Sequence, residues 1–110
     1  KPLFTDLPIP EIGYLKVEND GEGYKSIGWR FTPTCIFDRR KLLQFLTCLK
    51  VERMKAVFIT VDGIFAYNLT KDSITEVALD DCIESRIEII SQEIDKSWQE
   101  ALIGCKNLSN

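Results

Sequence analysis

Two β-rich runs on either side of Asp62-Gly63 constrain the fold of this sequence more than any other feature. Residues 54–61 and 64–70 are rich in aliphatic and aromatic side chains, and an Asp-Gly pair between such runs is a strong signal for a tight hairpin turn. Both runs are apolar at odd and at even positions, so both faces of the hairpin are apolar. A sheet with one face in water alternates apolar and polar residues instead. We therefore expect the hairpin at the centre of a sheet whose two faces are both covered.

Four further strands are predicted from alternating apolar residues and from the turns that separate them. The pattern is clearest before residue 32, where Ile27, Trp29 and Phe31 point to one side of a strand and small or polar residues point to the other. The four strands are predicted over residues 14–18, 24–31, 74–79 and 85–90.

Two amphipathic helices complete the predicted fold. The first runs from about residue 39 to 50, with Asp38 as its N-cap and with Phe37 and Leu42 placed to form a hydrophobic staple. The second closes the chain and is capped by Asp95 or, alternatively, by Ser91. The element order β-β-α-β-β-β-β-α predicts an α+β fold in the ferredoxin-like neighbourhood, with two helices against a mostly antiparallel sheet of four to five strands. The predicted buried face of the second helix comprises Ile94, Trp98, Ala101, Leu102 and Cys105.

One domain is expected over residues 14–110, preceded by a linker or extended strap over residues 1–13, which contain three prolines. A chain of 110 residues suits a single hydrophobic core. The first residue is Lys1 and the sole methionine is Met54. We therefore expect the chain to be a piece of a longer protein.

Composition and motifs argue against catalysis and against nucleic-acid binding. The sequence has no histidine, so neither a Ser-His nor a Cys-His nucleophile can be built from it. It lacks the glycine-rich phosphate-binding patterns of nucleotide-binding proteins. Its formal charge is −3, whereas nucleic-acid-binding domains are usually basic. No apolar run is long enough to cross a membrane. We predict no catalytic, cofactor-binding or metal-binding residue.

The cysteines and two charged clusters are the other candidate sites. The cysteines are scattered without a C-x-x-C pair, so we expect four free thiols in a reducing cytoplasm rather than a zinc site or disulfides. The acidic residues around Cys82 could bind a divalent metal, but solvated carboxylates are the preferred interpretation. A basic patch opens the first helix, where it could bind an anion or an acidic partner or could simply be solvated. The acidic cluster is Asp80, Asp81 and Glu84, and the basic patch is Arg39, Arg40 and Lys41.

Six residues of the central hairpin are predicted to form a face that contacts a partner. Monomers rarely expose more than a few hundred Å² of contiguous apolar surface, and the two predicted helices cover one face of the sheet. The second face is therefore expected to dock on a further domain or on a second copy of the chain. The N-terminal strap is the rival cover, through Leu3, Phe4, Leu7, Ile9 and Ile12. The candidate partner face comprises Val57, Ile59, Val61, Phe65, Tyr67 and Leu69.

Several short motifs, taken in order from Ser26 to Cys105, resemble the C-terminal domain of CobW-type P-loop GTPases. The stretch over residues 37–46 is similar to the family's amphipathic helix and the aromatic residue before it. Arg53-Met54-Lys55-Ala56 is similar to a pattern R-x-K-G, with alanine in place of glycine. Ser85-Arg86 precedes aliphatic residues as in the family's penultimate strand, and a closing helix ends near a cysteine. Ser91 replaces a common glycine, and the histidine often found in the first strand is absent.

The resemblance implies that this chain is a noncatalytic accessory domain in the cytoplasm. GTP, magnesium and a transition metal such as zinc or cobalt would bind only in a separate N-terminal domain. The implied partners are that GTPase domain, a metalloprotein client or a second copy of the chain, with no nucleic acid and no membrane. The implied process is metal delivery or cobalamin-related metabolism. The alternative is a free-standing α+β module that binds a small ligand or regulates a protein partner.

Overall fold

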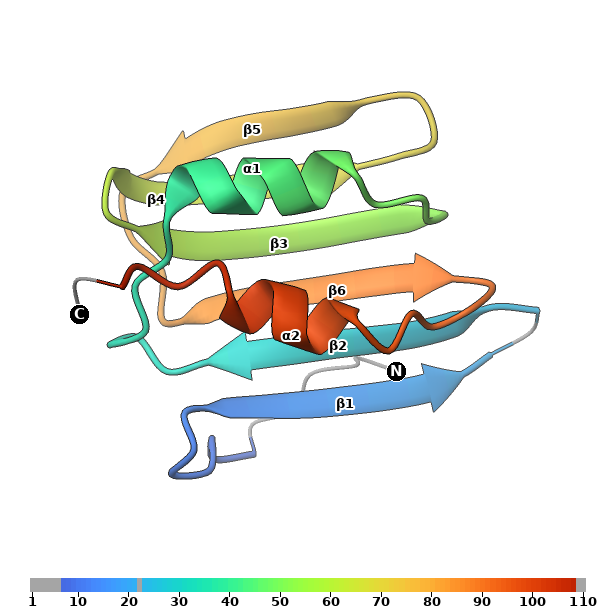
Figure 1. The fold of residues 1–110 in the computed structure, drawn as a ribbon, viewed down its shortest axis with the longest axis horizontal. Helices are drawn as coiled ribbons and strands as arrows, with labels where there is room; N and C mark the ends of the chain where they lie inside the picture. The colour runs from blue at the N-terminus through green and yellow to red at the C-terminus, as the bar shows by residue number, and fades with distance from the viewer. Residues whose placement is uncertain (1–6, 22, 109–110) are drawn as a thin grey trace.

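The computed structural model describes residues 7–21 and 23–108 and contains an α+β fold with the predicted order of elements (Figure 1). The fold class is confirmed, but the sheet has six strands rather than four to five, because the outer runs pair as edge strands. The elements are β1 (Tyr14–Asp20), β2 (Lys25–Phe31), α1 (Arg39–Thr47), β3 (Arg53–Thr60), β4 (Gly63–Leu69), β5 (Ile74–Leu79), β6 (Ser85–Ser91) and α2 (Trp98–Ile103).

The strand order in the sheet is β1-β2-β6-β3-β4-β5, and every neighbouring pair is antiparallel. Helix α1 connects β2 to β3, and the last strand of the chain, β6, lies between these two (Figure 1). This arrangement is the split β-α-β unit of ferredoxin-like folds. It makes β6 the one strand that joins the β1–β2 hairpin to the β3–β4–β5 meander.

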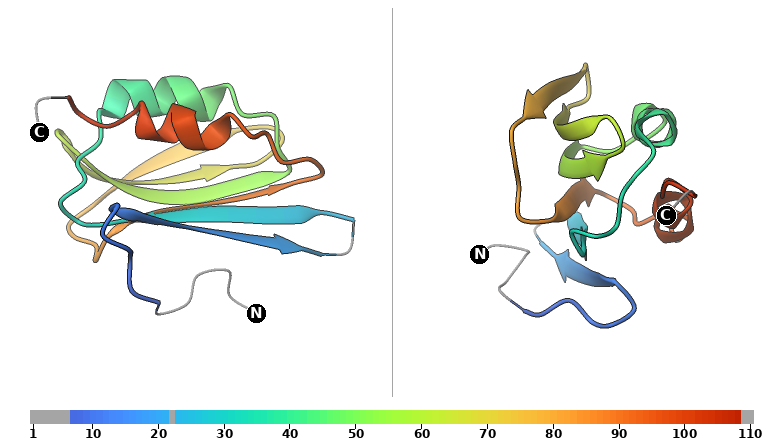
Figure 2. Two further views of the ribbon diagram at one scale, coloured as in Figure 1. Left: turned by 60° about the horizontal axis from the view of Figure 1, so that its bottom comes forward. Right: turned by 90° about the vertical axis from the view of Figure 1, so that its left-hand side faces the viewer.

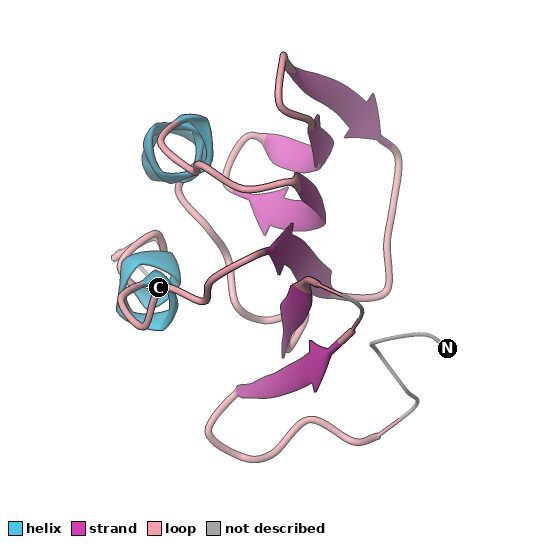
Figure 3. Ribbon diagram, turned by 90° about the vertical axis from the view of Figure 1, so that its right-hand side faces the viewer, coloured by secondary structure: helices cyan, strands magenta, loops and turns pink. Residues whose placement is uncertain are grey.

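Both helices pack on the same face of the sheet, and neither lies on the other face (Figures 2 and 3). Aromatic rings pack edge to face through the covered layer, with ring centroids 5.1 Å apart for Phe31 and Phe37 and 4.8 Å apart for Phe37 and Phe58. Helix α2 is tied to the sheet by Trp29, whose indole N–H donates to the Gln99 side-chain oxygen at 3.2 Å. The largest fully buried apolar side chains are Trp29, Phe31, Phe37, Phe58, Leu42, Leu46, Met54, Ile87, Ile89 and Leu102.

The helix starts and ends differ in part from the predicted ones. Asp38 caps α1 as predicted, because its carboxylate accepts from the Lys41 backbone N–H at 2.9 Å. The helix ends at Thr47 rather than near residue 50, and the Thr47 hydroxyl donates back to the Leu43 carbonyl. Helix α2 begins at Trp98, later than predicted, because the Asp95 carboxylate binds Ser97 in a turn before it. Of its predicted buried face, Ala101 is exposed.

The central hairpin forms, but its turn is shifted by one residue from the predicted one. Val61 and Asp62 make the two-residue turn, and Gly63 is already paired with Thr60 in the sheet. Gly63 has a φ of 129°, which residues with a Cβ rarely adopt, so glycine is required here. The Thr60 hydroxyl closes the turn by donating to the Gly63 carbonyl oxygen at 2.8 Å and accepting from the Asp62 N–H at 3.1 Å.

Candidate functional site

The six residues of the predicted partner face do not share one face of the sheet. Val57 lies opposite Ala66, and Phe58 lies opposite Phe65. Residues directly opposite each other in an antiparallel pair point to the same side. A two-residue turn therefore groups odd positions of β3 with even positions of β4, and the prediction that odd positions of both strands group together is wrong.

Three of the predicted face residues belong to the helix-covered layer. Phe65 is buried and Tyr67 is 2% exposed, while Leu69 packs at the margin of the core. Tyr67 also donates its hydroxyl hydrogen to the Glu76 carboxylate at 2.7 Å. Burial and this hydrogen bond raise the pKa of Tyr67. Phe65 and Tyr67 are therefore held inside the monomer and are not available to a partner.

The opposite face of the hairpin carries four half-buried apolar side chains that form an open apolar patch. Val57 and Ile59 come from β3, and their cross-strand neighbours Ala66 and Ile64 come from β4. Neither helix lies over this side of the sheet, and among the described residues the β5–β6 connection crosses it (Figures 2 and 3). The remaining predicted residue, Val61, is 61% exposed in the turn beyond the patch. The open apolar patch is therefore Val57, Ile59, Ile64 and Ala66.

The N-terminal strap meets a different part of the same face. One of its contacts is the Leu7 carbonyl oxygen, which accepts from Arg30 Nη1 of β2 at 2.6 Å, and another is the Gly13 carbonyl oxygen, which accepts from the Thr32 N–H at 3.0 Å. The described part of the strap lies beside β1 and β2 rather than β3 and β4 (Figures 1 and 2). Leu7 and Ile12 are exposed. Leu3 and Phe4, which were part of the predicted cover, lie outside the described residues.

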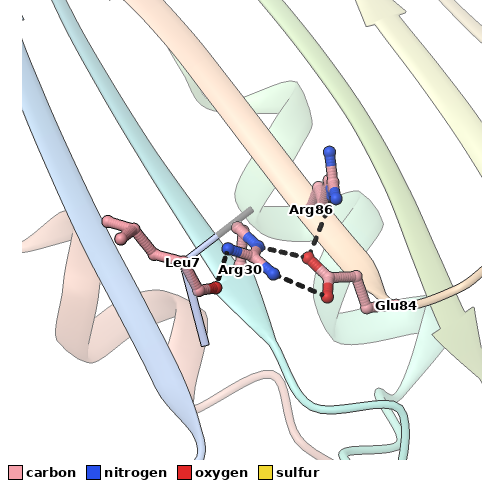
Figure 4. A network of polar contacts seen from close by, with 4 residues as sticks. All are labelled: Leu7, Arg30, Glu84 and Arg86. Carbon is pink, nitrogen blue, oxygen red and sulfur yellow. Dashed lines mark hydrogen bonds and ion pairs between the residues drawn. The ribbon is translucent and has the colours of Figure 1, made fainter. Parts of the chain in front are cut away.

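A buried ion-pair network borders the patch on its β6 side (Figure 4). Glu84, in the connection before β6, accepts from Arg30 Nη2 at 3.1 Å and from Arg86 Nε at 2.9 Å, and it also binds Arg30 Nε. Arg30 and Glu84 are 6% and 7% exposed. Hydrogen bonds from Arg30, and secondarily from Arg86, lower the pKa of Glu84 despite its burial. The network fixes the β5–β6 connection to β2 and places Arg86 opposite Val57 in the sheet.

A shallow hollow of about 350 Å³ lies between β6, β3 and β4, over the Val57 and Ala66 end of the patch. Its floor is apolar, and charged side chains from β3 and β6 stand around it. The side-chain oxygen of Asn68 is buried, and it has no hydrogen-bond partner among the described residues. The hollow is thus an apolar surface with a charged rim, which is the usual composition of a protein contact. Its lining includes Lys55, Val57, Ala66, Asn68, Arg86 and Glu88.

The predicted basic patch is divided by internal contacts. Arg39 binds the Glu76 carboxylate of β5 at 2.6 Å and lies over the Phe65 ring at 4.0 Å from its centroid. Its guanidinium therefore fastens α1 to the sheet and is not directed at an external anion. Arg40 is exposed and Lys41 is half-buried. Nothing in the structure joins the three side chains into one site.

Neither the cysteines nor the acidic cluster form a metal centre in the described part of the chain. All four thiols are free, and no group of three or more His, Cys, Asp or Glu residues within residues 7–21 and 23–108 is placed to bind a metal. Glu84 is bound by Arg30 and Arg86, so its carboxylate does not form a joint site with Asp80 and Asp81. Burial raises the pKa of Cys105 to about 11, so this thiol is neutral at physiological pH. Within the same residues, no helix has the length and apolarity to span a bilayer.

Comparison with known proteins gives one informative similarity. The chain is 34% identical over 92 residues to the zinc chaperone YeiR of Escherichia coli (strain K12), and the match covers 77% of the chain. The same match covers 27% of YeiR, so the chain spans about a quarter of the length of this curated relative. No protein-family model matches the chain, and no solved structure matches it significantly. The similarity therefore relates the chain to one segment of a zinc chaperone.

Proposed function

We propose that this chain is the noncatalytic C-terminal accessory domain of a CobW-type metal chaperone and that it docks on the GTP-binding domain through the open apolar patch. The observation that carries the proposal is the similarity to a quarter of the zinc chaperone YeiR. The motifs around Arg53 and Ser85 point to the same family. A partial match of this kind fits a domain that acts only as part of a larger protein.

The chemistry of the described residues supports an accessory role. The chain has no histidine to act as a base or metal ligand. Its buried thiol at Cys105 is protonated, and its buried carboxylate at Glu84 is neutralised by two arginines. GTP, magnesium and the transported metal are therefore assigned to the rest of the protein, which works in the cytoplasm.

The open apolar patch supports docking as the mode of action. Its four side chains come from β3 and β4 and lie on the sheet face that neither helix covers. Lys55, Arg86 and Glu88 stand beside it, so its rim carries both signs of charge and would favour a partner surface with complementary charges. A free-standing module that binds a small ligand in the same hollow is the competing function.

Mixing the two domains tests the proposal directly. This chain and the GTP-binding domain that we expect in the same reading frame are produced separately and titrated against each other by calorimetry. We expect Val57→Asp to weaken binding by at least about tenfold, because a charge buried in an apolar contact is strongly unfavourable. Val61→Asp is the matched control, since Val61 lies outside the patch and is already exposed.

Two results would contradict different parts of the proposal. A reading frame that encodes no GTP-binding domain would rule out the CobW assignment. Equal binding of Val57→Asp and the unmodified chain, with both shown to be folded by circular dichroism, would rule out the patch as the contact surface. Saturable binding of a small metabolite by the chain alone would favour the competing function.

A further inference from the structure

We infer that two copies of this chain pair through the edge strand β5, so that their sheets continue across a two-fold axis. Among the described residues β5 has a neighbour on one side only, which is β4. The other side of the strand faces outward, and residues 75–80 are all exposed. This contact uses the edge of the sheet, whereas the proposed docking on a GTPase domain uses the patch over β3 and β4.

The hydrogen-bonding pattern shows which peptide groups β5 presents. The turn between β4 and β5 is closed by the Thr70 N–H, which donates to the Ser73 carbonyl oxygen at 2.9 Å. Hydrogen-bonded and non-hydrogen-bonded pairs alternate along an antiparallel ladder. The paired register therefore directs the peptide groups of Thr75 and Val77 toward β4, and those of Glu76 and Ala78 outward. An outward row of this kind is a template for another strand.

The side chains of β5 have few of the features that usually block such pairing. Natural edges are protected by lysine, proline, bulges or inward-pointing charges, and β5, with the sequence Ile-Thr-Glu-Val-Ala-Leu, has neither lysine nor proline. Its one charged residue, Glu76, is bound to Arg39 and Tyr67 of the same chain. Val77 and Leu79 are 56% and 38% exposed. The edge is therefore apolar and open.

The other edge of the sheet provides a contrast. Strand β1 has the sequence Tyr-Leu-Lys-Val-Glu-Asn-Asp, in which three of the exposed positions carry charges. Lys16 and Glu18 form a surface ion pair at 3.5 Å. These charged side chains protect β1 in the way that natural edges are protected. Self-pairing is accordingly assigned to β5 and not to β1.

Symmetry and charge select one register for the β5–β5 contact. A two-fold axis perpendicular to the sheet keeps the helix-covered faces of both copies on the same side. Residues opposite each other must then point to the same face, so odd-numbered residues pair with odd-numbered ones and even-numbered residues with even-numbered ones. Centring the axis on Glu76 would put two carboxylates opposite each other, which is unfavourable. Centring it on Val77 pairs Val77 with its own copy, Thr75 with Leu79, and Glu76 with Ala78. The second register also pairs the outward peptide groups of Glu76 and Ala78 with those of the other copy.

Charges beyond the strand favour a second copy as the occupant. Lys71 precedes β5 and forms an ion pair with Glu52 at 3.4 Å, but its side chain is 69% exposed, while Asp80 and Asp81 follow β5 and are exposed. Antiparallel pairing brings the lysine end of each copy to the acidic end of the other. The edge of β5, with a positive charge before the strand and negative charges after it, is therefore complementary to a second copy of itself.

Disulfide trapping tests the register. In a Cys48→Ser background, which removes the exposed native thiol, Val77→Cys should form a covalent dimer under mild oxidation. Val77 meets its own copy at a non-hydrogen-bonded position, where paired side chains lie closest. Val61→Cys is the matched control, because Val61 is equally exposed but lies in the turn after β3. Equal cross-linking of the two variants, or none for Val77→Cys, would overturn the inference.

Analytical ultracentrifugation tests the contact without a covalent cross-link. We expect concentration-dependent dimers of the unmodified chain and at least about tenfold weaker association for Ala78→Pro, which removes an outward N–H without affecting the β4 ladder. Val77→Lys, which introduces a charge at the axis, should have the same effect and serves if the proline variant fails to fold. Val57→Asp should dimerise normally, which separates this contact from the proposed docking surface. A monomer at all concentrations, or dimers unaffected by Val77→Lys, would refute the pairing.

Discussion

The two faces of β3 show how one strand serves two purposes. Phe58 is fully buried beneath the helices and packs edge to face on Phe37, with 4.8 Å between the ring centroids. Its neighbour Val57 is half-buried on the opposite face, where no helix lies. Both side chains are apolar, so composition alone does not distinguish them. The difference lies in what covers each face, and it separates residues that stabilise the monomer from residues that are available for contacts.

The largest expected effect of substitution is on the covered face. Phe58→Ala should reduce the free energy of unfolding by about 3–5 kcal/mol, because it removes a large buried ring and leaves a cavity. Urea denaturation followed by tryptophan fluorescence measures the change, since Trp29 is buried in the same core. A loss below about 1 kcal/mol would mean that the helices do not pack tightly on the sheet.

The ion-pair network on the open face should have an intermediate effect. Glu84→Gln replaces the charged acceptor of Arg30 and Arg86 with a neutral one. We expect a loss of about 1–3 kcal/mol at neutral pH, because buried donors lose their best acceptor. Glu88→Gln, on the same face and in the next strand, is the control and should change stability little. Equal losses for the two variants would contradict a special role for the network.

The same network predicts a specific dependence on pH. The pKa of Glu84 is below its ordinary value of 4.5 in the folded chain. The stabilisation is therefore fully present above pH 4.5 and is lost as the pH falls through the lower, folded value. The difference in unfolding free energy between the unmodified chain and Glu84→Gln should shrink on acidification. A constant difference down to strongly acidic pH would show that ionisation of Glu84 does not stabilise the fold.

The smallest effect is expected for Val57→Ala on the open face. Its side chain is only half-buried, so the loss should be under about 1 kcal/mol. The comparison with Phe58→Ala is made in one chain, one strand and adjacent positions. If the two variants lost the same stability, Val57 would have to be covered as fully as Phe58, and the open apolar patch would not exist.

Local features of the fold could be predicted from the sequence, because they depend on neighbouring residues. The N-cap at Asp38, the hairpin near Asp62 and the order of elements are examples. The prediction that Val57 and Phe65 lie on the same face of the sheet was wrong. A face shared by two strands depends on the register between them and not on the alternation within each strand. The central position of β6 could not be predicted either, because strand order is set by tertiary packing.

The candidate site was predictable only in part. The sequence indicated that both faces of the hairpin are apolar, and two members of the open apolar patch, Val57 and Ile59, were identified. The ion pair between Arg30 and Glu84 was missed, because its members lie 54 positions apart. The available signal was Arg30 itself, a charged residue inside an otherwise apolar strand. Such a residue needs a partner when it is buried.

The central position of β6 has a consequence for how the protein is made. During synthesis the β1–β2 hairpin and the β3–β4–β5 meander emerge first, yet they share no strand contact until β6 enters between them. Such non-local pairings form slowly compared with hairpins. The nascent chain therefore exposes two unpaired strand edges, on β2 and on β3, until residue 91 leaves the ribosome. A chain cut short before β6 would hold both edges open permanently and would be a target for proteolysis or aggregation.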